Sequence, residues 1–165
     1  MSFEPIPVET EFAAKTLIDA AFSVYRELGP GLLESVYEAC LCHELTLRGV
    51  AFQSQLALPV KYRGMQLDGG LRLDLVVENR LVIELKAVEM LLPVHEAQVL
   101  TYLKLSGHRL GILLNFNVPR IKDGIKRIVL ELSPLCLRDF VVKFPPHTER
   151  KDDLSPFLFS FPSQT

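Results

Sequence analysis

The sequence predicts a single α/β domain in which helices flank a central mixed β-sheet. Two helical segments come first, short apolar strands follow, and a further helix precedes the last strands. With 165 residues, 48% of them hydrophobic and 23% charged, the chain can bury the core of an ordinary globular domain. We therefore expect one domain over residues 1–143 and a separate tail over residues 144–165.

The first third of the chain has the spacing of two helices. Apolar residues recur at three- and four-residue steps over residues 11–28, and Thr10 can cap the start of this helix. Gly29-Pro30-Gly31 then ends it. A second helix is expected over residues 33–48, with Gly49 as its stop.

The middle of the chain has the composition of strands joined by turns. Residues 51–62 predict one strand or two, because Pro59 interrupts the segment. The remaining elements of this region are expected to be turns at 63–64 and 68–70 and strands at 71–77 and 81–87.

A third helix and the last strands complete the predicted sheet. Pro93 suits a first helical turn and Gly107 a helix end, so residues 93–106 are expected to be helical. After it we expect a buried strand at 110–115, a loop at 117–119, a strand rather than a short helix at 125–132, and a strand at 134–142.

The tail differs from the rest of the chain. Pro145-Pro146 breaks regular structure, residues 149–153 are a run of charges, and residues 155–161 are apolar and aromatic. We expect such a tail to dock either on its own domain or on a partner.

The strands at 71–77 and 81–87 place like charges together. Side chains of a strand alternate, so each strand has an apolar side (Leu71, Leu73, Leu75, Val77; Leu81, Ile83, Leu85, Ala87) and a side with charges (Arg72, Asp74, Val76; Val82, Glu84, Lys86). If residues 78–80 form the turn, Asp74 lies directly opposite Glu84. Facing like charges destabilise a strand pair. Two facing carboxylates are favourable when a divalent cation lies between them.

The helix at 93–106 adds polar groups in a helical spacing. Gln98 and Tyr102 are four residues apart and share one face, with His95 three residues before Gln98. This face could lie over the carboxylates. We expect His95 to be a surface or supporting residue rather than a metal ligand.

Three segments together resemble a known enzyme superfamily. Leu71 to Asp74, Glu84-Leu85-Lys86 and Gln98 to Tyr102 resemble the PD-(D/E)XK nuclease superfamily, and the Gln-xxx-Tyr element is similar to that of its RecB-like branch. Upstream, residues 31–37 spell the pattern of the GxxExxY protein family, and Asn115-Phe116 with residues 122–127 resemble its later segment. The resemblance covers about residues 10–130 and implies a restriction-endonuclease-like core.

The resemblance implies a divalent metal site. Asp74 and Glu84 would be its carboxylate ligands, the carbonyl of Leu85 a third ligand, and Glu34 a further one through water. Mg²⁺, or Mn²⁺ in its place, suits such oxygen ligands because it retains several waters. The structural alternatives are that Asp74 and Glu84 are solvent-facing charges and that Glu34 caps its helix.

The resemblance also implies roles for the neighbouring groups. Lys86 would hold the attacking water, neutralise the phosphate or act in acid–base catalysis, while Gln98 and Tyr102 would orient the phosphate or the lysine. The alternatives are an ordinary ion pair for Lys86 and an exposed helix face for Gln98 and Tyr102. Tyr37 is expected to pack in the core. Leu73 stands where the superfamily's motif has proline.

Charge is unevenly distributed along the chain, although its net value is only −2. Residues 1–60 contain three basic and eight acidic side chains, whereas in residues 104–127 the one acidic side chain is Asp123. This segment contains six basic candidates for contact with nucleic acid: Lys104, Arg109, Arg120, Lys122, Lys126 and Arg127. The alternative is that these are solvated surface charges.

The cysteines and the start of the chain bear on location. Cys40, Cys42 and Cys136 have no metal-binding spacing, so we expect three reduced thiols in a cytoplasmic protein. No signal peptide is recognisable, and no apolar run approaches the ~20 residues of a membrane span.

The combined expectations favour a metal-dependent nuclease that acts on DNA. Two alternatives remain open. One is a non-catalytic nucleic-acid-binding module with a relic site, and the other is a protein-interaction component that uses the acidic helices or the aromatic tail. The expected partners are accordingly nucleic acid and either a second copy of the chain or another protein.

Overall fold

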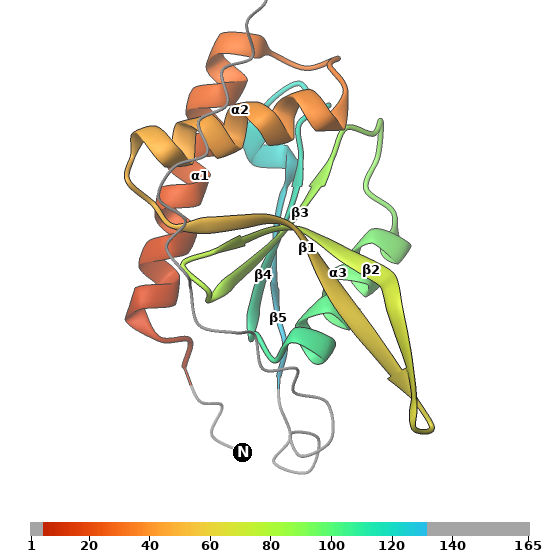
Figure 1. Ribbon diagram of the computed structural model, residues 1–165. Coiled ribbons are helices and arrows are strands. Elements are labelled where there is room, and N and C mark those ends of the chain that lie inside the picture. Colours follow the sequence, from red (N-terminus) through yellow and green to blue (C-terminus); the bar gives the residue numbers. More distant parts are fainter. Residues whose placement is uncertain (1–4, 132–165) are drawn as a thin grey trace, which may run out of the picture.

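A five-stranded mixed sheet forms the centre of residues 5–131, the part of the chain that this computed structural model describes (Figure 1). Its strands lie side by side in chain order: β1 (Phe52–Tyr62), β2 (Met65–Val77), β3 (Leu81–Lys86), β4 (Leu110–Asn115) and β5 (Ile125–Val129). β3 and β4 are parallel, and all other neighbours are antiparallel. The predicted α/β class with a mixed sheet is confirmed.

Helices cover both faces of the sheet (Figure 1). α1 (Val8–Leu28) and α2 (Glu34–Leu47) bury one apolar cluster against it, and α3 (Pro93–Ser106) buries a second cluster on the other face. α3 also connects the parallel strands β3 and β4. Because helices cover these two strands on both faces, their sequences are almost continuously apolar rather than alternating.

Most predicted elements are present with small shifts at their ends. α1 begins at Val8 after Pro7, so Thr10 lies inside the helix rather than at its cap. β1 is one strand, and its pairing with β2 shifts register between Leu58 and Val60. The irregularity expected at Pro59 is therefore a bulge within a strand and not a break between two strands.

The predicted turn at residues 68–70 is wrong. β2 continues through this segment, because its pairing with β1 runs from Leu71 opposite Leu58 to Leu67 opposite Val60. The shifted register accommodates two additional residues of β2 and keeps the two strands paired on either side of them. The short 3₁₀ helix η1 (Ile121–Gly124) leads into β5, and β5 lies within the strand expected at 125–132. The strand expected at 134–142, Cys136, the domain end at 143 and the tail at 144–165 lie outside the described residues.

The turn between β2 and β3 is the predicted three-residue turn. The N–H of Arg80 donates to the carbonyl of Val77 at 3.0 Å, and Glu78 and Asn79 have positive φ values of 53° and 52°. The strand pairs are Val77 with Leu81 and, farther from the turn, Leu75 with Ile83. The next position in this register would place Asp74 by Glu84, but the ladder ends at Leu75.

The predicted single apolar side of β2 is only partly correct. Leu75 and Val77 belong to the cluster under α1 and α2, whereas Leu73 belongs to the cluster under α3. The change occurs opposite Gln55, whose φ of 52° interrupts the extended conformation of β1. The β1–β2 hairpin therefore bends between Leu75 and Leu73, and its outer half, which projects from the sheet in Figure 1, presents the opposite side to α3.

No helix in residues 5–131 is both long and apolar enough to cross a membrane.

Gly124 provides a test of the packing at the end of β4. A Cβ added there would lie 2.1 Å from the backbone carbonyl oxygen of Asn115, which cannot move aside as a flexible side chain would. Gly124→Ala should therefore lower the free energy of unfolding in urea by about 2–3 kcal/mol. Gly70→Ala is the matched control, because its Cβ would meet Val60 at an ordinary 3.6 Å. Equal midpoints for the two variants would contradict this packing.

Candidate active site

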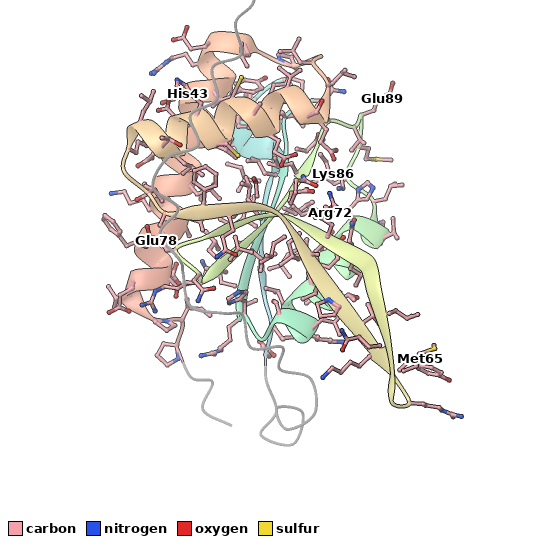
Figure 2. The ribbon with its side chains drawn as sticks, viewed as in Figure 1. His43, Met65, Arg72, Glu78, Lys86 and Glu89 are labelled. Atoms are coloured by element: carbon pink, nitrogen blue, oxygen red, sulfur yellow. The ribbon has the colours of Figure 1, made fainter. Side chains whose placement is uncertain are left out.

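The polar cluster lies where the parallel strands β3 and β4 end. β3 ends with Glu84, Leu85 and Lys86, which pair in register with Leu113, Leu114 and Asn115 of β4. Parallel strands bring their carboxyl ends to one edge of a sheet, and ligand sites of open α/β sheets form there. Figure 2 shows Lys86 at this edge, beneath the N-terminal end of α2.

Glu84 is the deeply buried member of the cluster. Its side chain is 2% exposed, one carboxylate oxygen accepts a hydrogen bond from the ammonium of Lys86, and the other, Oε2, is buried without a hydrogen-bond partner among the described residues. Burial, followed by the negative charge of Asp74, raises the pKa of Glu84 to about 7, although Lys86 opposes the shift. This carboxyl group is therefore poised to exchange a proton or a ligand near neutral pH.

Lys86 stays charged in spite of its burial. Burial lowers its pKa, but the hydrogen bond to Glu84 and the charges of Glu84, Glu34 and Asp74 outweigh that effect and raise the pKa overall. Its Nζ also donates to the carbonyl oxygen of Leu85 at 2.9 Å. Lys86 is consequently an ammonium ion with two oxygen partners.

Asp74 contacts β3 through a hydrogen bond from its side chain to the β3 backbone, rather than as a residue paired with Glu84 across the two strands. Its Oδ2 accepts the N–H of Leu85 at 2.8 Å, which fixes the carboxylate where the β1–β2 hairpin bends. Asp74 is close enough to raise the pKa of Glu84 by its charge. The predicted proximity of two carboxylates is present, with a hydrogen bond in place of direct strand pairing.

Glu34 brings a third carboxylate to the same place from α2. It is the first residue of that helix and accepts a hydrogen bond from the backbone of Ala87, just after β3. Burial raises the pKa of Glu34, the charge of Lys86 lowers it, and the charge of Asp74 raises it. Glu34 thus joins the cluster, and the start of α2 has no side-chain cap.

Tyr37 connects the helix of Glu34 to β4. Its ring stacks on Phe116 with centroids 4.4 Å apart and planes 7° from parallel. Its hydroxyl donates to the carbonyl of Gly29 at 2.7 Å and accepts the N–H of Leu32 at 3.1 Å, which fixes the loop before α2. The N–H of Phe116 in turn donates to the carbonyl of Lys86 at 2.9 Å. Tyr37 is a core residue, as expected, and it also positions Glu34 relative to Lys86.

Asn115 is a supporting residue whose role the sequence did not predict. It is 1% exposed, its Oδ1 accepts the N–H groups of Val88 and Asn117, and its Nδ2 donates to the carbonyl of Val88 at 2.8 Å. These bonds hold the segment after Lys86 against the end of β4. The sequence signal that could have predicted this role is the single polar residue at the end of an otherwise apolar strand.

Gln98 and Tyr102 lie together on α3, as their spacing predicts. The side-chain amide of Gln98 donates to the Tyr102 hydroxyl at 2.7 Å. Burial raises the pKa of Tyr102, the Gln98 bond lowers it in part, and the charge of Glu84 raises it. Tyr102 is therefore within electrostatic reach of the carboxylates, and Gln98 is bonded to it. His95 instead accepts the N–H of Leu92 at 3.1 Å and helps to cap α3.

The donors of this cluster suit a hard cation in their chemistry. Glu34, Asp74, Glu84 and the carbonyl of Leu85 all offer oxygen, the donor type that Mg²⁺ prefers, and Glu84 Oε2 is buried without a partner among the described residues. In their present positions, however, no group of three or more His, Cys, Asp or Glu side chains within residues 5–131 is placed to hold a metal ion. The Lys86 ammonium already pairs with Glu84 and Leu85.

The six basic residues do not form one surface. Lys126 pairs with Glu96 of α3, while its neighbour Arg127 makes two hydrogen bonds to Glu11 of α1 on the other face of the sheet. Arg120 pairs with Asp123 at 2.8 Å.

The other three basic residues are also separated from one another. Arg109 lies at the opposite end of β4 from the cluster, and its guanidinium donates to the carbonyl of Pro5 at 3.3 Å. Lys104 lies in the last turn of α3, and Lys122 is exposed on η1. A role for all six together in nucleic-acid contact is thus not suggested by their placement.

Comparison with known proteins gives one match. The family model of the PD-(D/E)XK nuclease superfamily matches residues 11–128, which include all the carboxylates and polar groups of the cluster. No curated protein and no solved structure matches the chain.

Tyr37→Phe tests the link between α2 and the site. The variant keeps the stacked ring but removes the hydroxyl, so the Gly29 carbonyl and the Leu32 N–H lose a common partner. We expect a loss of about 1–3 kcal/mol in the free energy of unfolding measured in urea. Tyr62→Phe, which removes a hydroxyl from an exposed ring, is the control and should unfold as the wild type does. A similar loss in both variants would argue against the link.

Glu84 predicts a pH dependence in the absence of divalent ions. Its pKa is raised from 4.5 to about 7 in the folded chain, so its protonated form is the one that favours folding. This contribution is fully present below about pH 4.5, falls as the pH rises to about 7, and is constant above that. Its total is at most about 3 kcal/mol.

Urea unfolding in a chelating buffer from acidic to weakly alkaline pH measures this effect. The difference in the free energy of unfolding between the wild type and Glu84→Gln should change between about pH 4.5 and about pH 7 and be constant outside that range. Glu89→Gln, at an exposed position on the loop after β3, is the control and should follow the wild type. A wild-type profile parallel to that of Glu84→Gln would exclude a raised pKa at Glu84.

Proposed function

The chain belongs to the PD-(D/E)XK nuclease superfamily, and on this premise we propose that it is a metal-dependent nuclease that hydrolyses phosphodiester bonds in DNA. The observation that supports this most is Glu84: a carboxylate kept almost fully from solvent, with one oxygen unpartnered among the described residues, beside Asp74 and Lys86. Burying such a group costs stability unless it is paired. A metal-binding function accounts for keeping it there.

The proposed ligands are Asp74, Glu84 and the carbonyl of Leu85, with Glu34 acting through water. When bound, Mg²⁺ or Mn²⁺ supplies an activated water and neutralises charge on the scissile phosphate. Binding of the ion would require Glu84 and the Leu85 carbonyl to give up their hydrogen bonds to the Lys86 ammonium. The bound ion would then take the place of the ammonium as the positive charge beside the three carboxylates.

Lys86 would then be free to act on the substrate. Since its pKa is raised, it is an ammonium ion at neutral pH and acts as a donor rather than a general base. Its place at the end of β3 supports a hydrogen bond to the phosphate or to the attacking water. The donor would stabilise the negative charge that develops in the transition state.

Gln98 and Tyr102 are proposed to align this donor and the phosphate. Because Gln98 donates to the Tyr102 hydroxyl, the hydroxyl proton is directed elsewhere and is available to an acceptor. The raised pKa of Tyr102 keeps that proton in place at neutral pH. These two residues act as positioning groups in the proposal.

Within the superfamily, we place the chain in the GxxExxY family and the RecB-like branch. Support comes from Gly31, Glu34 and Tyr37, whose spacing is the family's pattern, and from Gln98 and Tyr102 on one helix. The contacts of Tyr37 offer a reason for its place in the pattern, because they position Glu34.

A second candidate is a non-catalytic nucleic-acid-binding module on the same fold. One observation favours it: Lys86 already pairs with Glu84, and Asp74 uses one oxygen for the N–H of Leu85. A relic site would be stabilised by this internal pairing and would need no metal. Cleavage assays separate the two candidates.

The decisive assay is cleavage of plasmid and linear DNA with Mg²⁺, with Mn²⁺ and with a chelator. We expect metal-dependent cleavage by the wild type and a loss of at least about 100-fold in rate for Asp74→Ala, Glu84→Ala and Lys86→Ala, because each removes transition-state charge stabilisation. Glu89→Ala, which removes an exposed carboxylate nearby in sequence, should retain the rate. Activity that survives in Asp74→Ala and Glu84→Ala, or that is absent from a folded wild type with either metal, would reject the nuclease proposal.

A further inference from the structure

The outer half of the β1–β2 hairpin projects from the sheet as an arm, which we define as residues 60–72 (Figure 1). β2 begins at Met65, but its pairing with β3 begins only at Leu75, so residues 65–74 extend beyond β3. At about 3.3 Å per residue, ten residues span about 30 Å. Among the described side chains of this extension, Leu71 and Leu73 at its inner end pack in the cluster under α3.

One face of the arm is apolar and exposed. Tyr62 pairs with Met65 and Val60 pairs with Leu67, and directly opposed residues share a face. The exposed fractions are 58% for Tyr62, 54% for Met65 and 45% for Leu67. Within residues 5–131, these apolar side chains at the tip of a projecting hairpin belong to neither buried cluster, so they indicate a binding surface.

The arm is also basic. Residues 60–72 contain Lys61, Arg63 and Arg72 against a single acidic residue, Asp68. The guanidinium of Arg63 lies 5.5 Å from the centre of the Tyr62 ring, and neither Lys61 nor Arg72 makes an ion pair within the described part of the chain. These cations contrast with Lys126, Arg127 and Arg120, which are neutralised by nearby carboxylates.

We propose that this arm binds nucleic acid, inserting its apolar tip into the minor groove of a duplex while Lys61, Arg63 and Arg72 contact the phosphates. Apolar wedges flanked by arginine and lysine are the chemistry by which proteins enter that groove. A second copy of the chain fits less well, since two equivalent arms packed together would bring like charges into contact.

The position of the arm connects it to the candidate active site. Arg72 is two residues from Asp74 along β2, and in the view of Figure 2 it lies between Met65 at the tip and Lys86 at the site. A duplex held along the arm would therefore extend to the carboxylate cluster. The inference rests on the proposed nuclease function for its substrate, but binding by the arm is measurable without cleavage.

The test measures binding of a short fluorescein-labelled DNA duplex by anisotropy in a chelator, over a series of salt concentrations. Lys61→Glu combined with Arg63→Glu should weaken binding at least about tenfold and lower the salt slope by about two, because each substitution removes one cation that binds a phosphate. Tyr62→Ala should weaken binding about tenfold and leave the salt slope unchanged.

Two variants on α1, far from the arm in Figure 1, are matched controls. Lys15→Glu reverses an exposed lysine, and Phe12→Ala truncates an aromatic ring that is 70% exposed. Both should bind DNA as the wild type does. Circular dichroism and urea midpoints like those of the wild type confirm that the arm variants are folded.

The outcomes distinguish the arm from the nuclease proposal. If the arm variants bind and cut as the wild type does, the arm inference is wrong and the nuclease proposal stands. Arm-dependent binding without cleavage supports the arm and rejects the nuclease. A wild type that neither binds nor cuts DNA rejects both. Light scattering that shows a wild-type dimer and a Tyr62→Ala monomer with unchanged DNA binding would reassign the arm to self-association.

Discussion

The burial of the Glu84 carboxylate is the constraint on which the candidate site depends. A charged group in this position costs stability. Lys86 offsets this cost through one oxygen of the Glu84 carboxylate, and the other oxygen has no partner among the described residues. The surrounding contacts fix the partners of this pair: the N–H of Leu85 holds Asp74, the backbone of Ala87 holds Glu34, and Asn115 holds the segment after Lys86. An apolar residue in place of Glu84 would remove this cost, which is the physical argument for the proposed metal-binding role of the carboxylate.

In this cluster, the arrangement that suits metal binding lowers the stability of the fold. The interactions that raise the pKa of Glu84 are burial and the charge of Asp74, and both work against keeping three carboxylates together. Among the described residues, Lys86 is the cation whose charge counters both Glu34 and Glu84. An ion that takes its place must therefore provide at least the same compensation, which a divalent cation does.

Much of the fold follows from local patterns that the sequence displays openly. Helices α2 and α3 and strand β4 match their expected ranges within a residue or so, because their apolar spacing and their Gly and Pro ends agree with the tertiary packing. The three-residue turn at 78–80 was also predictable, and with it the proximity of Asp74 to Glu84.

The parts that could not be predicted depend on distant contacts. The residues around Gly69 looked like a turn, but pairing with β1 keeps β2 extended there. The change of face at Leu73 arises from Gln55 on the neighbouring strand, which no alternation within β2 reveals. Similarly, the basic residues of 104–127 are close in sequence, yet carboxylates of α1 and α3 neutralise Arg127 and Lys126 from opposite faces of the sheet.

The stack of Tyr37 on Phe116 has a consequence for when the candidate site is completed during folding. It joins a residue of the second helix to one just after the fourth strand, so the geometry around Glu34 and Lys86 is complete only after that strand has paired. Contacts of such long sequence separation form late, because the intervening chain must first be ordered. During synthesis, a chain that ends before Phe116 lacks this support. The arrangement of Glu34 and Lys86 that the proposed function requires is therefore complete only once the strands around it have formed.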